Sequence, residues 1–327
     1  MKRFLTGLQP TGCITLGNYI GAIKQMVKYQ DEYESFIFIA DMHAITIPQN
    51  PETLSKNIKD LVAIYLACGL DPKKNTIFLQ SENIYHANVS WILECNTPYG
   101  QLGRMTQFKD KSQKHQNFMA GLFTYPVLMA ADILIYDTDC VPVGKDQKQH
   151  VELARDIAEA FNKKYEKEIF KLPEPLIPEE GAKIADLVDP SKKMSKSAEN
   201  KKGVIFLLDS EKDIRKKIMS ATTDSEMVVK YDPENKPGIS NLMTIYKELS
   251  GMSISEIEDH FKEANYGTFK KEVADLVCEK LLPIQEKYYS YMSSGEIDEI
   301  LDNGKNITNE IAKKKYEELK QVVGLHR

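Results

Sequence analysis

The residues from Gln9 to Asn18 have the types that hold a phosphate group in a short turn. Gly12 and Gly17 let a ligand approach the backbone, and Thr15 and Asn18 add neutral hydrogen-bond donors. A helix that begins here would also present free N–H groups to an anion. Glycines serve an ordinary strand-to-helix turn equally well, so the motif alone leaves both interpretations open.

A second group of phosphate-binding types lies much later, in the basic and hydroxyl-rich residues 189–197. Its lysines and serines could hold phosphates as mobile donors, whereas the alternative is a flexible charged linker. Three further lysines, Lys109, Lys111 and Lys114, lie close together in residues 105–114. For these three, a solvated face is the simpler interpretation.

One acid interrupts a mostly apolar stretch, residues 124–133. Asp132 follows Met129 by three residues, so on a helix the two side chains share a face. A buried carboxylate is costly unless it is paired or hydrogen-bonded, so Asp132 has either a structural partner or a ligand donor to accept from. His43 follows a predicted strand, at the edge where open α/β sheets bind ligands, but a lone histidine is more often structural.

The elements that must position these groups alternate between strands and helices. Continuous apolar runs, typical of buried parallel strands, occupy residues 4–8, 36–41, 76–80 and 140–144. Asn50 and Pro51 open a helix that Gly69 ends, and Asp146 is expected to cap a helix over residues 147–161. This alternation predicts an α/β fold with a Rossmann-like parallel sheet that binds a nucleotide.

Two regions depart from the alternation. Residues 84–124 read as a helical insertion between two halves of the nucleotide fold. After residue 208 the pattern is helical, and Ser210 with Asp213 forms a capping box at its start. The further helices are expected at about 239–250, 253–264, 268–291, 296–302 and 307–323. We therefore predict two domains, a catalytic one over residues 1–190 and an all-helical one over residues 191–327.

Composition narrows the class of protein. With 42% apolar and 28% charged residues, the 327-residue chain resembles ordinary globular proteins. Its net charge of −5 means that any nucleic-acid surface must be a local patch. No apolar run approaches the ~20 residues that span a membrane, so no membrane association is expected. The five cysteines are scattered, which favours a reducing cytoplasm and gives no support for zinc or an iron–sulfur cluster.

Three motifs, in this order, resemble the signatures of class I aminoacyl-tRNA synthetases. Residues 10–18 resemble the HIGH-type signature, with Thr15 and Asn18 where it usually has histidines. Residues 141–150 resemble the middle signature shared by tryptophanyl- and tyrosyl-type enzymes, and residues 193–197 form a full KMSKS signature. An ordered set of this kind is far more specific than any one of its motifs.

The resemblance extends over essentially the whole chain. Further matching segments are residues 105–109, 125–132, 189–197 and 236–242. On these motifs the chain is identified as a member of the bacterial tryptophanyl-tRNA synthetase family, with the tyrosyl-type enzymes as the alternative. Leu5 departs from the family pattern, which commonly has an aromatic residue there, near the amino-acid pocket.

The resemblance implies a two-step reaction. The carboxylate of L-tryptophan attacks the α-phosphate of ATP, which forms tryptophanyl-adenylate and releases pyrophosphate, and the 3′ end of tRNA(Trp) then accepts the amino acid. The first nucleophile is already an anion, so the protein must supply position and charge stabilisation and needs no general base. By resemblance, the residues that act in catalysis are Thr15, Asn18, Lys111, Lys193, Ser195 and Lys196.

The resemblance also implies two sets of binding residues. Those expected to bind ATP are Gln9, Pro10, Thr11, Gly17, Asn18, Gly144, Lys145, Asp146, Ile184, Lys193, Met194, Ser195, Lys196 and Ser197. Those expected to bind tryptophan are His43, Tyr125, Met129, Asp132, Val141, Val143 and Gln147. In the second set Asp132 would accept the indole N–H, which can only donate.

The expected partners follow from the same resemblance. Mg²⁺ would arrive with ATP, bridging phosphates rather than sitting in a protein cage. The helical domain would receive the tRNA anticodon, its last helix being free to pack back on the catalytic domain. The family also implies a homodimer in the cytoplasm.

Overall fold

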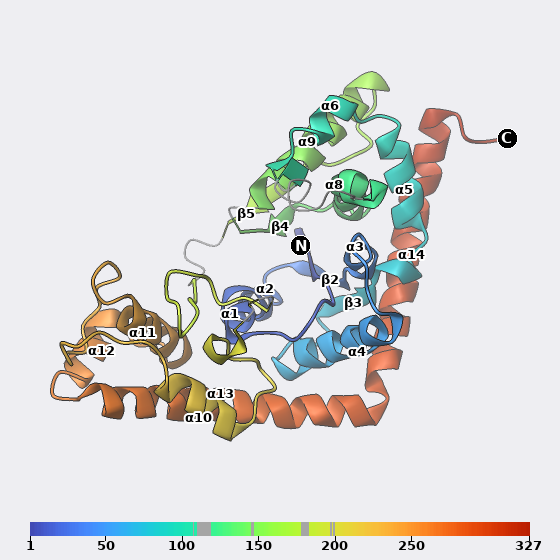
Figure 1. The fold of residues 1–327 in the computed structure, drawn as a ribbon. Helices are drawn as coiled ribbons and strands as arrows, with labels where there is room; N and C mark the ends of the chain where they lie inside the picture. Colours follow the sequence, from blue (N-terminus) through green and yellow to red (C-terminus); the bar gives the residue numbers. More distant parts are fainter. Residues whose placement is uncertain (107, 110–118, 145–146, 178–182, 197, 199) are drawn as a thin grey trace.

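A computed structural model describes residues 1–106, 108–109, 119–144, 147–177, 183–196, 198 and 200–327. Within these residues the chain forms a five-stranded sheet in the order β3-β2-β1-β4-β5, and every neighbouring pair is parallel (Figure 1). The strands are β1 (Arg3–Leu8), β2 (Glu34–Ile39), β3 (Asn75–Leu79), β4 (Cys140–Pro142) and β5 (Glu174–Leu176). The predicted α/β fold with a parallel sheet is confirmed.

The order of the strands creates a switch point beside β1. The chain builds outward from β1 to β2 and β3, then returns to the other side of β1 as β4, where Phe4 pairs with Cys140. In open α/β sheets, ligands bind in the crevice outside the carboxyl ends of the strands at such a point. The carboxyl end of β1 leads directly into residues 9–18, and that of β4 into Val143 and Gly144.

Helices connect and cover these strands. A continuous helical stretch follows β1, made of α1 (Leu16–Asn18), a π-helical part η1 (Tyr19–Ile23) and α2 (Lys24–Tyr29). The helices from β2 to β5 are α3 (Asp41–Ala44), α4 (Pro51–Ala67), η2 (Gln80–Glu82), α5 (Tyr85–Glu94), α6 (Tyr99–Leu102), α8 (Ala120–Leu134) and α9 (Lys148–Lys164). Asn50 caps α4 as predicted, because its side chain accepts from Thr53 N at 2.9 Å. The predicted cap Asp146 lies outside the described residues.

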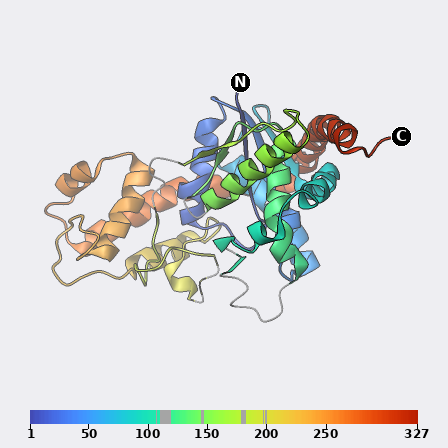
Figure 2. The same cartoon turned by 90° about the horizontal axis from the view of Figure 1, so that it is seen from above.

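The C-terminal part is helical, as predicted, and it wraps around the sheet. Its helices are η4 (Lys201–Gly203), α10 (Glu211–Met219), α11 (Pro237–Ser250), α12 (Ile254–His260), α13 (Tyr266–Ser294) and α14 (Glu296–Val323). In Figure 1, α13 runs along the bottom against α4, and α14 rises on the right beside β3 and α5. Figure 2 shows α11 and α12 at the opposite end of the molecule from α14.

One prediction about this part is wrong. Two helices were expected at 296–302 and 307–323, separated near Gly304, but α14 runs through without a break. Gly304 is not a helix end, since it lies where α14 approaches the sheet most closely. A β-carbon there would come within 1.9 Å of the Ile77 carbonyl oxygen, so only glycine lets the helix backbone lie on β3.

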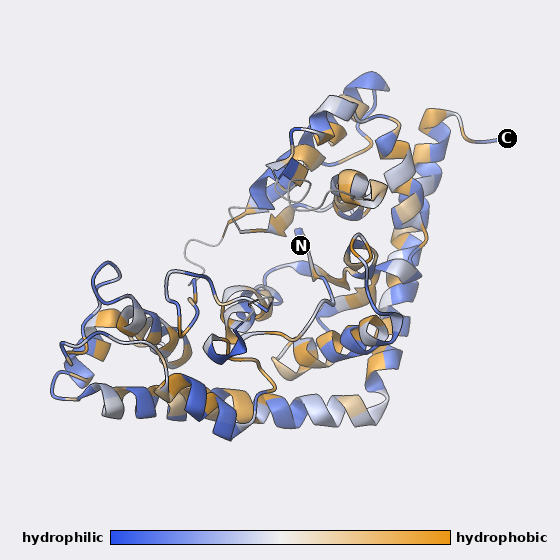
Figure 3. Ribbon diagram, in the orientation of Figure 1, coloured by the Kyte–Doolittle hydropathy of each residue, from blue (hydrophilic) through white to orange (hydrophobic). Residues whose placement is uncertain are grey.

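A hydrophobic core runs without interruption from the sheet into the C-terminal helices. Buried side chains of β2 and α4, such as Ile37 and Tyr65, belong to the same cluster as Phe269 and Leu281 of α13. The ribbon of α13 alternates between hydrophilic and hydrophobic colours along its length, as expected for a helix with one buried face (Figure 3). The division into domains at residue 190 stays a prediction.

Candidate active site

The two predicted phosphate-binding segments, some 175 residues apart, meet at the switch point. A β-carbon on Gly17 would lie 3.6 Å from Ile184 Cβ and 3.7 Å from Met194 Cβ. One on Gly12, which has a φ of +76°, would lie 3.8 Å from Cδ of Lys196. The basic segment at residues 189–196, called the lysine loop below, therefore lies within van der Waals reach of the turn at residues 9–18. At Gly12 the positive φ favours glycine.

A third segment holds the turn in place. Residues 204–208 run antiparallel to it, with hydrogen bonds from Leu16 N to Ile205 O at 2.8 Å and from Leu207 N to Ile14 O at 2.9 Å. These bonds follow the lysine loop closely in sequence, so the chain returns to the turn immediately after the loop. The turn therefore receives backbone bonds from a segment almost 190 residues away.

Thr15 and Asn18 form a closed capping box at the start of the helix. Thr15 Oγ1 accepts from Asn18 N at 3.1 Å, and Asn18 Oδ1 accepts from Thr15 N at 3.2 Å and from Thr15 Oγ1 at 3.0 Å. Thr15 is fully buried. The Asn18 side-chain nitrogen makes no hydrogen bond to a described residue, so of these two side chains it is the one with a donor to offer.

The lysine loop is fixed at its base and open at its tip. Ala185 and Lys193 form an antiparallel bridge, and Met194 N donates to Ile184 O at 2.9 Å. Ile184 and Met194 are buried, whereas Lys193 is exposed. Burial lowers the pKa of Lys196, which is only half-exposed beside the turn.

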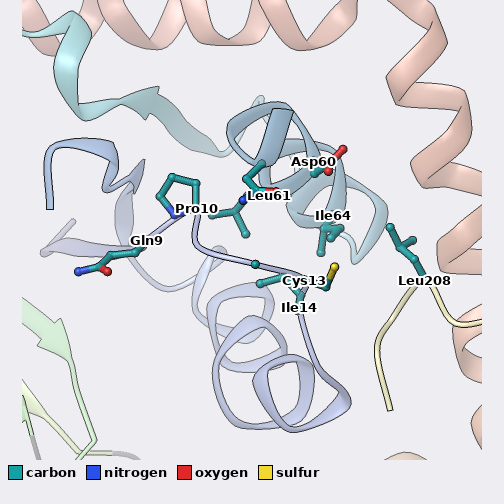
Figure 4. Close-up of a pocket in the computed structure, with 10 residues that line it drawn as sticks. Gln9, Pro10, Cys13, Ile14, Asp60, Leu61, Ile64 and Leu208 are labelled. Atoms are coloured by element: carbon teal, nitrogen blue, oxygen red, sulfur yellow. The ribbon is translucent and has the colours of Figure 1, made fainter. Parts of the chain in front are cut away.

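A small cavity lies behind the turn, between residues 9–14 and helix α4 (Figure 4). Asp60, Leu61 and Ile64 line its α4 side, and the Gln9 side chain extends away from them. Its cavity volume of about 30 Å³ has room for a few water molecules at most, so it is far too small for a nucleotide.

Asp132, on α8, is the centre of a buried polar cluster. It is completely buried, and its carboxylate accepts from Gln80 Nε2 at 2.8 and 3.0 Å. His43 Nε2 lies 2.8 Å from Oδ2, and His86 Nδ1 lies 2.6 Å from Oδ1. Burial raises the pKa of Asp132, but the hydrogen bonds and charges of the two histidines outweigh it and bring the pKa to about 2. The carboxylate is therefore an acceptor at all working pH values.

The other predicted tryptophan-binding residues lie around this cluster or near it. The rings of His43 and Tyr125 meet edge to face, with centroids 6.2 Å apart. The Tyr125 hydroxyl is 3.0 Å from His150 Nε2, and burial raises its pKa to about 12. Val141 and Val143 belong to one hydrophobic cluster, against which Met129 packs. Gln147 is half-buried and its backbone N–H donates to the Gly144 carbonyl at 2.9 Å.

Gln80, His86 and Tyr136 belong to the Asp132 cluster, but sequence reasoning missed their roles. The apolar pattern predicts Gln80 only as the last residue of a strand, although a polar residue at the carboxyl end of a parallel strand is itself a signal. The pattern around His86 predicts only a helix, and nothing in its sequence neighbourhood points to Asp132. Four predicted site residues lie outside the described part of the chain: Lys111, Lys145, Asp146 and Ser197.

Comparison with known proteins places this fold and site in a family. The model of the tRNA synthetases class I (W and Y) matches residues 1–281. The chain therefore belongs to the class I tRNA synthetases of the tryptophan and tyrosine type, as the signature motifs predicted.

Within that family, enzymes of the tryptophan type are similar to this chain over nearly their whole length. A protein of Listeria monocytogenes named tryptophan–tRNA ligase is 54% identical over 326 residues, which cover 100% of this chain and 98% of that protein. The crystal structure of tryptophanyl-tRNA synthetase from Mycoplasma pneumoniae gives a TM-score of 0.90 at 38% identity, over 100% of this chain and 98% of that one. That of Campylobacter jejuni, complexed with ADP and tryptophan, gives 0.86 at 40%, over 98% and 99%. These relatives do not favour the tyrosyl alternative.

Proposed function

We propose that this chain attaches L-tryptophan to tRNA(Trp) in two steps. ATP and tryptophan first form tryptophanyl-adenylate with release of pyrophosphate, and the amino acid then passes to the tRNA 3′ end. The observation that carries the proposal is the close approach of Ile184 and Met194 to Gly17, which brings the two phosphate-binding segments together beside β1. The buried carboxylate of Asp132 is bonded to His43 and Gln80, which follow β2 and β3 at the carboxyl edge of the same sheet.

At the ATP end, the protein supplies position and positive charge. Lys193 is exposed and free to follow a leaving pyrophosphate, whereas Lys196 is held beside Gly12. Asn18 offers its side-chain amide, and Thr15 holds Asn18 through the capping box. Preorganised donors of this kind are worth most where charge develops in the transition state.

At the amino-acid end, the protein supplies a fixed acceptor. The indole N–H can only donate, and the ionised Asp132 can only accept. Asp132 keeps its bonds to Gln80, His43 and His86 in any case, but an amino acid without that donor would place an apolar ring against the buried carboxylate where a hydrogen bond should form. Such sites reject the wrong ligand by roughly 10⁴-fold in favourable cases. Phenylalanine should therefore be a very poor substrate.

Mg²⁺ belongs to this proposal as part of the substrate. The described residues contain no cluster of three metal-binding side chains. The side chains of the turn and loop offer mainly lysines, hydroxyls and amides, whose neutral oxygens could add single ligands to an ion but do not form a protein cage for it. The ion would reach the site on the phosphates of ATP and would neutralise part of their charge.

The test is ATP–pyrophosphate exchange with each amino acid, followed by charging of tRNA. We expect exchange with tryptophan and none with phenylalanine. Exchange with tyrosine instead would favour the tyrosyl alternative, and exchange without charging would point to a nucleotidylyltransferase of the same fold. A chain that does neither would be a catalytically silent relative.

The homodimer is a proposal supported by an exposed hydrophobic face. Ile84, Trp91 and Tyr99, before or on α5 and α6, are 63%, 66% and 79% exposed. Ile84 and Trp91 are seven residues apart, so they lie on the same side of α5, and exposed apolar side chains that share a side commonly mark a protein interface. Trp91 is the only tryptophan, so its emission should shift to the blue as subunit concentration rises. Trp91→Glu should give a monomer in analytical ultracentrifugation, and a variant that remains dimeric would contradict this choice of face.

We also propose that the protein binds tRNA and is located in the cytoplasm. The chain is acidic overall, so tRNA binding must rest on local basic patches and should weaken as salt rises. No helix in the described part of the chain is long and apolar enough to span a membrane. A cytoplasmic location remains a proposal that fractionation of cells can test.

A further inference from the structure

A chain of buried hydrogen bonds extends from Asp132 away from the crevice. His86 Nδ1 is 2.6 Å from Asp132 Oδ1, and His86 Nε2 is 2.7 Å from the Tyr136 hydroxyl. Asn83 Nδ2 donates to the same hydroxyl at 3.0 Å. The side chains of His86, Asp132 and Tyr136 are all fully buried, so water cannot replace any of these bonds.

The direction of each bond follows from the chemistry of the groups. The ionised Asp132 only accepts, so His86 must carry a proton on Nδ1. The Asn83 nitrogen only donates, so the Tyr136 oxygen accepts from it and keeps its own O–H to give. The 2.7 Å contact between the Tyr136 hydroxyl and His86 Nε2 holds the imidazole ring with Nδ1 toward Asp132.

This series of hydrogen bonds comes close to the C-terminal helix. Thr308 of α14 is fully buried and near enough to Tyr136 to affect its phenol, while its own hydroxyl donates to the Lys305 carbonyl at 3.3 Å. Burial and the Asp132 charge raise the pKa of Tyr136, and the polar groups of Thr308 and Asn83 oppose that rise. Four residues before Thr308, Gly304 lets α14 lie directly against β3.

These bonds determine which carboxylate oxygen of Asp132 faces a ligand. His86 holds Oδ1, which leaves Oδ2 on the side of His43. His43 meets the Tyr125 ring, so Oδ2 is the oxygen nearer to the predicted tryptophan pocket. Without His86 in place, Oδ1 would keep only its bond from Gln80, and the carboxylate would be free to turn about the partners that it shares with Oδ2.

We propose that Tyr136 and Thr308 are positioning residues for amino-acid recognition, which hold Asp132 through His86 so that Oδ2 faces the indole N–H. This inference rests on the proposed role of Asp132 in binding tryptophan. It makes the C-terminal helix part of the amino-acid site, although no residue of that helix touches the substrate.

The experiment measures KM for tryptophan and for ATP in pyrophosphate exchange, together with kcat and melting temperature. Tyr136→Phe should raise KM for tryptophan about tenfold, the factor that corresponds to the loss of one buried hydrogen bond. KM for ATP and kcat should stay within about threefold. Thr308→Val should shift KM for tryptophan the same way by a smaller factor, and Thr308→Ser, which keeps the hydroxyl, should restore it.

The matched control is Tyr65→Phe. Tyr65 is a fully buried phenol of α4, outside this chain of hydrogen bonds. Loss of its hydroxyl should leave KM for tryptophan unchanged, whatever it does to melting temperature. Equal effects of Tyr65→Phe and Tyr136→Phe on KM for tryptophan would overturn the proposal, because a general loss of stability would then explain both.

Asp132→Asn separates this inference from the proposed function. If that variant keeps the wild-type KM for tryptophan, the role of Asp132 is wrong and the positioning role falls with it. If Asp132→Asn loses tryptophan but Tyr136→Phe does not, only the positioning role is wrong. Should Tyr136→Phe fail to fold, Thr308→Val decides: an unchanged KM for tryptophan overturns the proposal.

Discussion

Replacing Asp132 with asparagine tests the amino-acid pocket most directly. The asparagine oxygen can keep the Oδ1 bonds from Gln80 and His86, while its amide nitrogen takes the place of Oδ2. His43 can then accept from that nitrogen, after its own proton moves to the other ring nitrogen. The folded protein thus exchanges charge-assisted bonds for neutral ones, which should lower the free energy of unfolding by about 2 kcal/mol.

The same substitution should weaken tryptophan activation by more than it lowers the free energy of unfolding. Its indole N–H would meet an amide N–H where it should meet a carboxylate oxygen, so a charge-assisted bond is lost and a buried donor stays unpaired. Together these should cost about 4 kcal/mol, which is about 10³-fold in kcat/KM for tryptophan. KM for ATP should change by less than about threefold, because Asp132 lies outside the turn and loop that face the phosphates.

Pyrophosphate exchange at varied tryptophan and ATP, with thermal denaturation alongside, measures both quantities. Asp139→Asn is the matched control, since Asp139 accepts from Arg3 N at the opposite, amino-terminal edge of the sheet. It should leave kcat/KM for tryptophan unchanged. If Asp132→Asn activated tryptophan as well as the wild type does, Asp132 would not be the acceptor of the indole N–H.

Three further predictions concern other features. Gly304→Ala should lower the free energy of unfolding by about 3 kcal/mol in chemical denaturation, because its β-carbon would meet a β3 carbonyl oxygen at 1.9 Å, whereas Gly121→Ala, with 4.0 Å of room, should be near neutral. Thr15→Ala removes a helix cap worth about 1 kcal/mol and should slow exchange up to about tenfold, whereas Lys196→Ala should slow it by about 10²-fold or more, and the reverse order would contradict the proposed roles. The pKa of Asp132 falls from 3.8 to about 2 on folding, so its carboxylate stabilises the fold above about pH 4 and this contribution fades toward pH 2. The gap in melting temperature between wild type and Asp132→Asn should narrow over that interval.

Local patterns in the sequence predicted most elements correctly. The apolar runs marked four of the five strands, and Asn50 marked the start of α4, because burial and helix capping depend on neighbours a few residues away. Local rules failed at Gly304. In an isolated helix a glycine is unfavourable, so the pattern predicts an end there. Only the contact with Ile77, more than 200 residues earlier, shows why glycine is needed inside α14.

The features of the candidate site can likewise be divided into those that the sequence predicts and those that only the tertiary structure shows. The sequence by itself determined which residues have phosphate-binding chemistry and that Asp132 is an acid in apolar surroundings, because residue type and spacing are properties of the chain. Only the tertiary structure decided that Lys196 lies beside Gly12, and that His86 and Tyr136 hold Asp132. Such pairings depend on how the strands order themselves and how α14 packs on β3. Residues far apart in the sequence form these pairs because the fold brings them together, and the periodicity of a local sequence pattern holds no information about that distance.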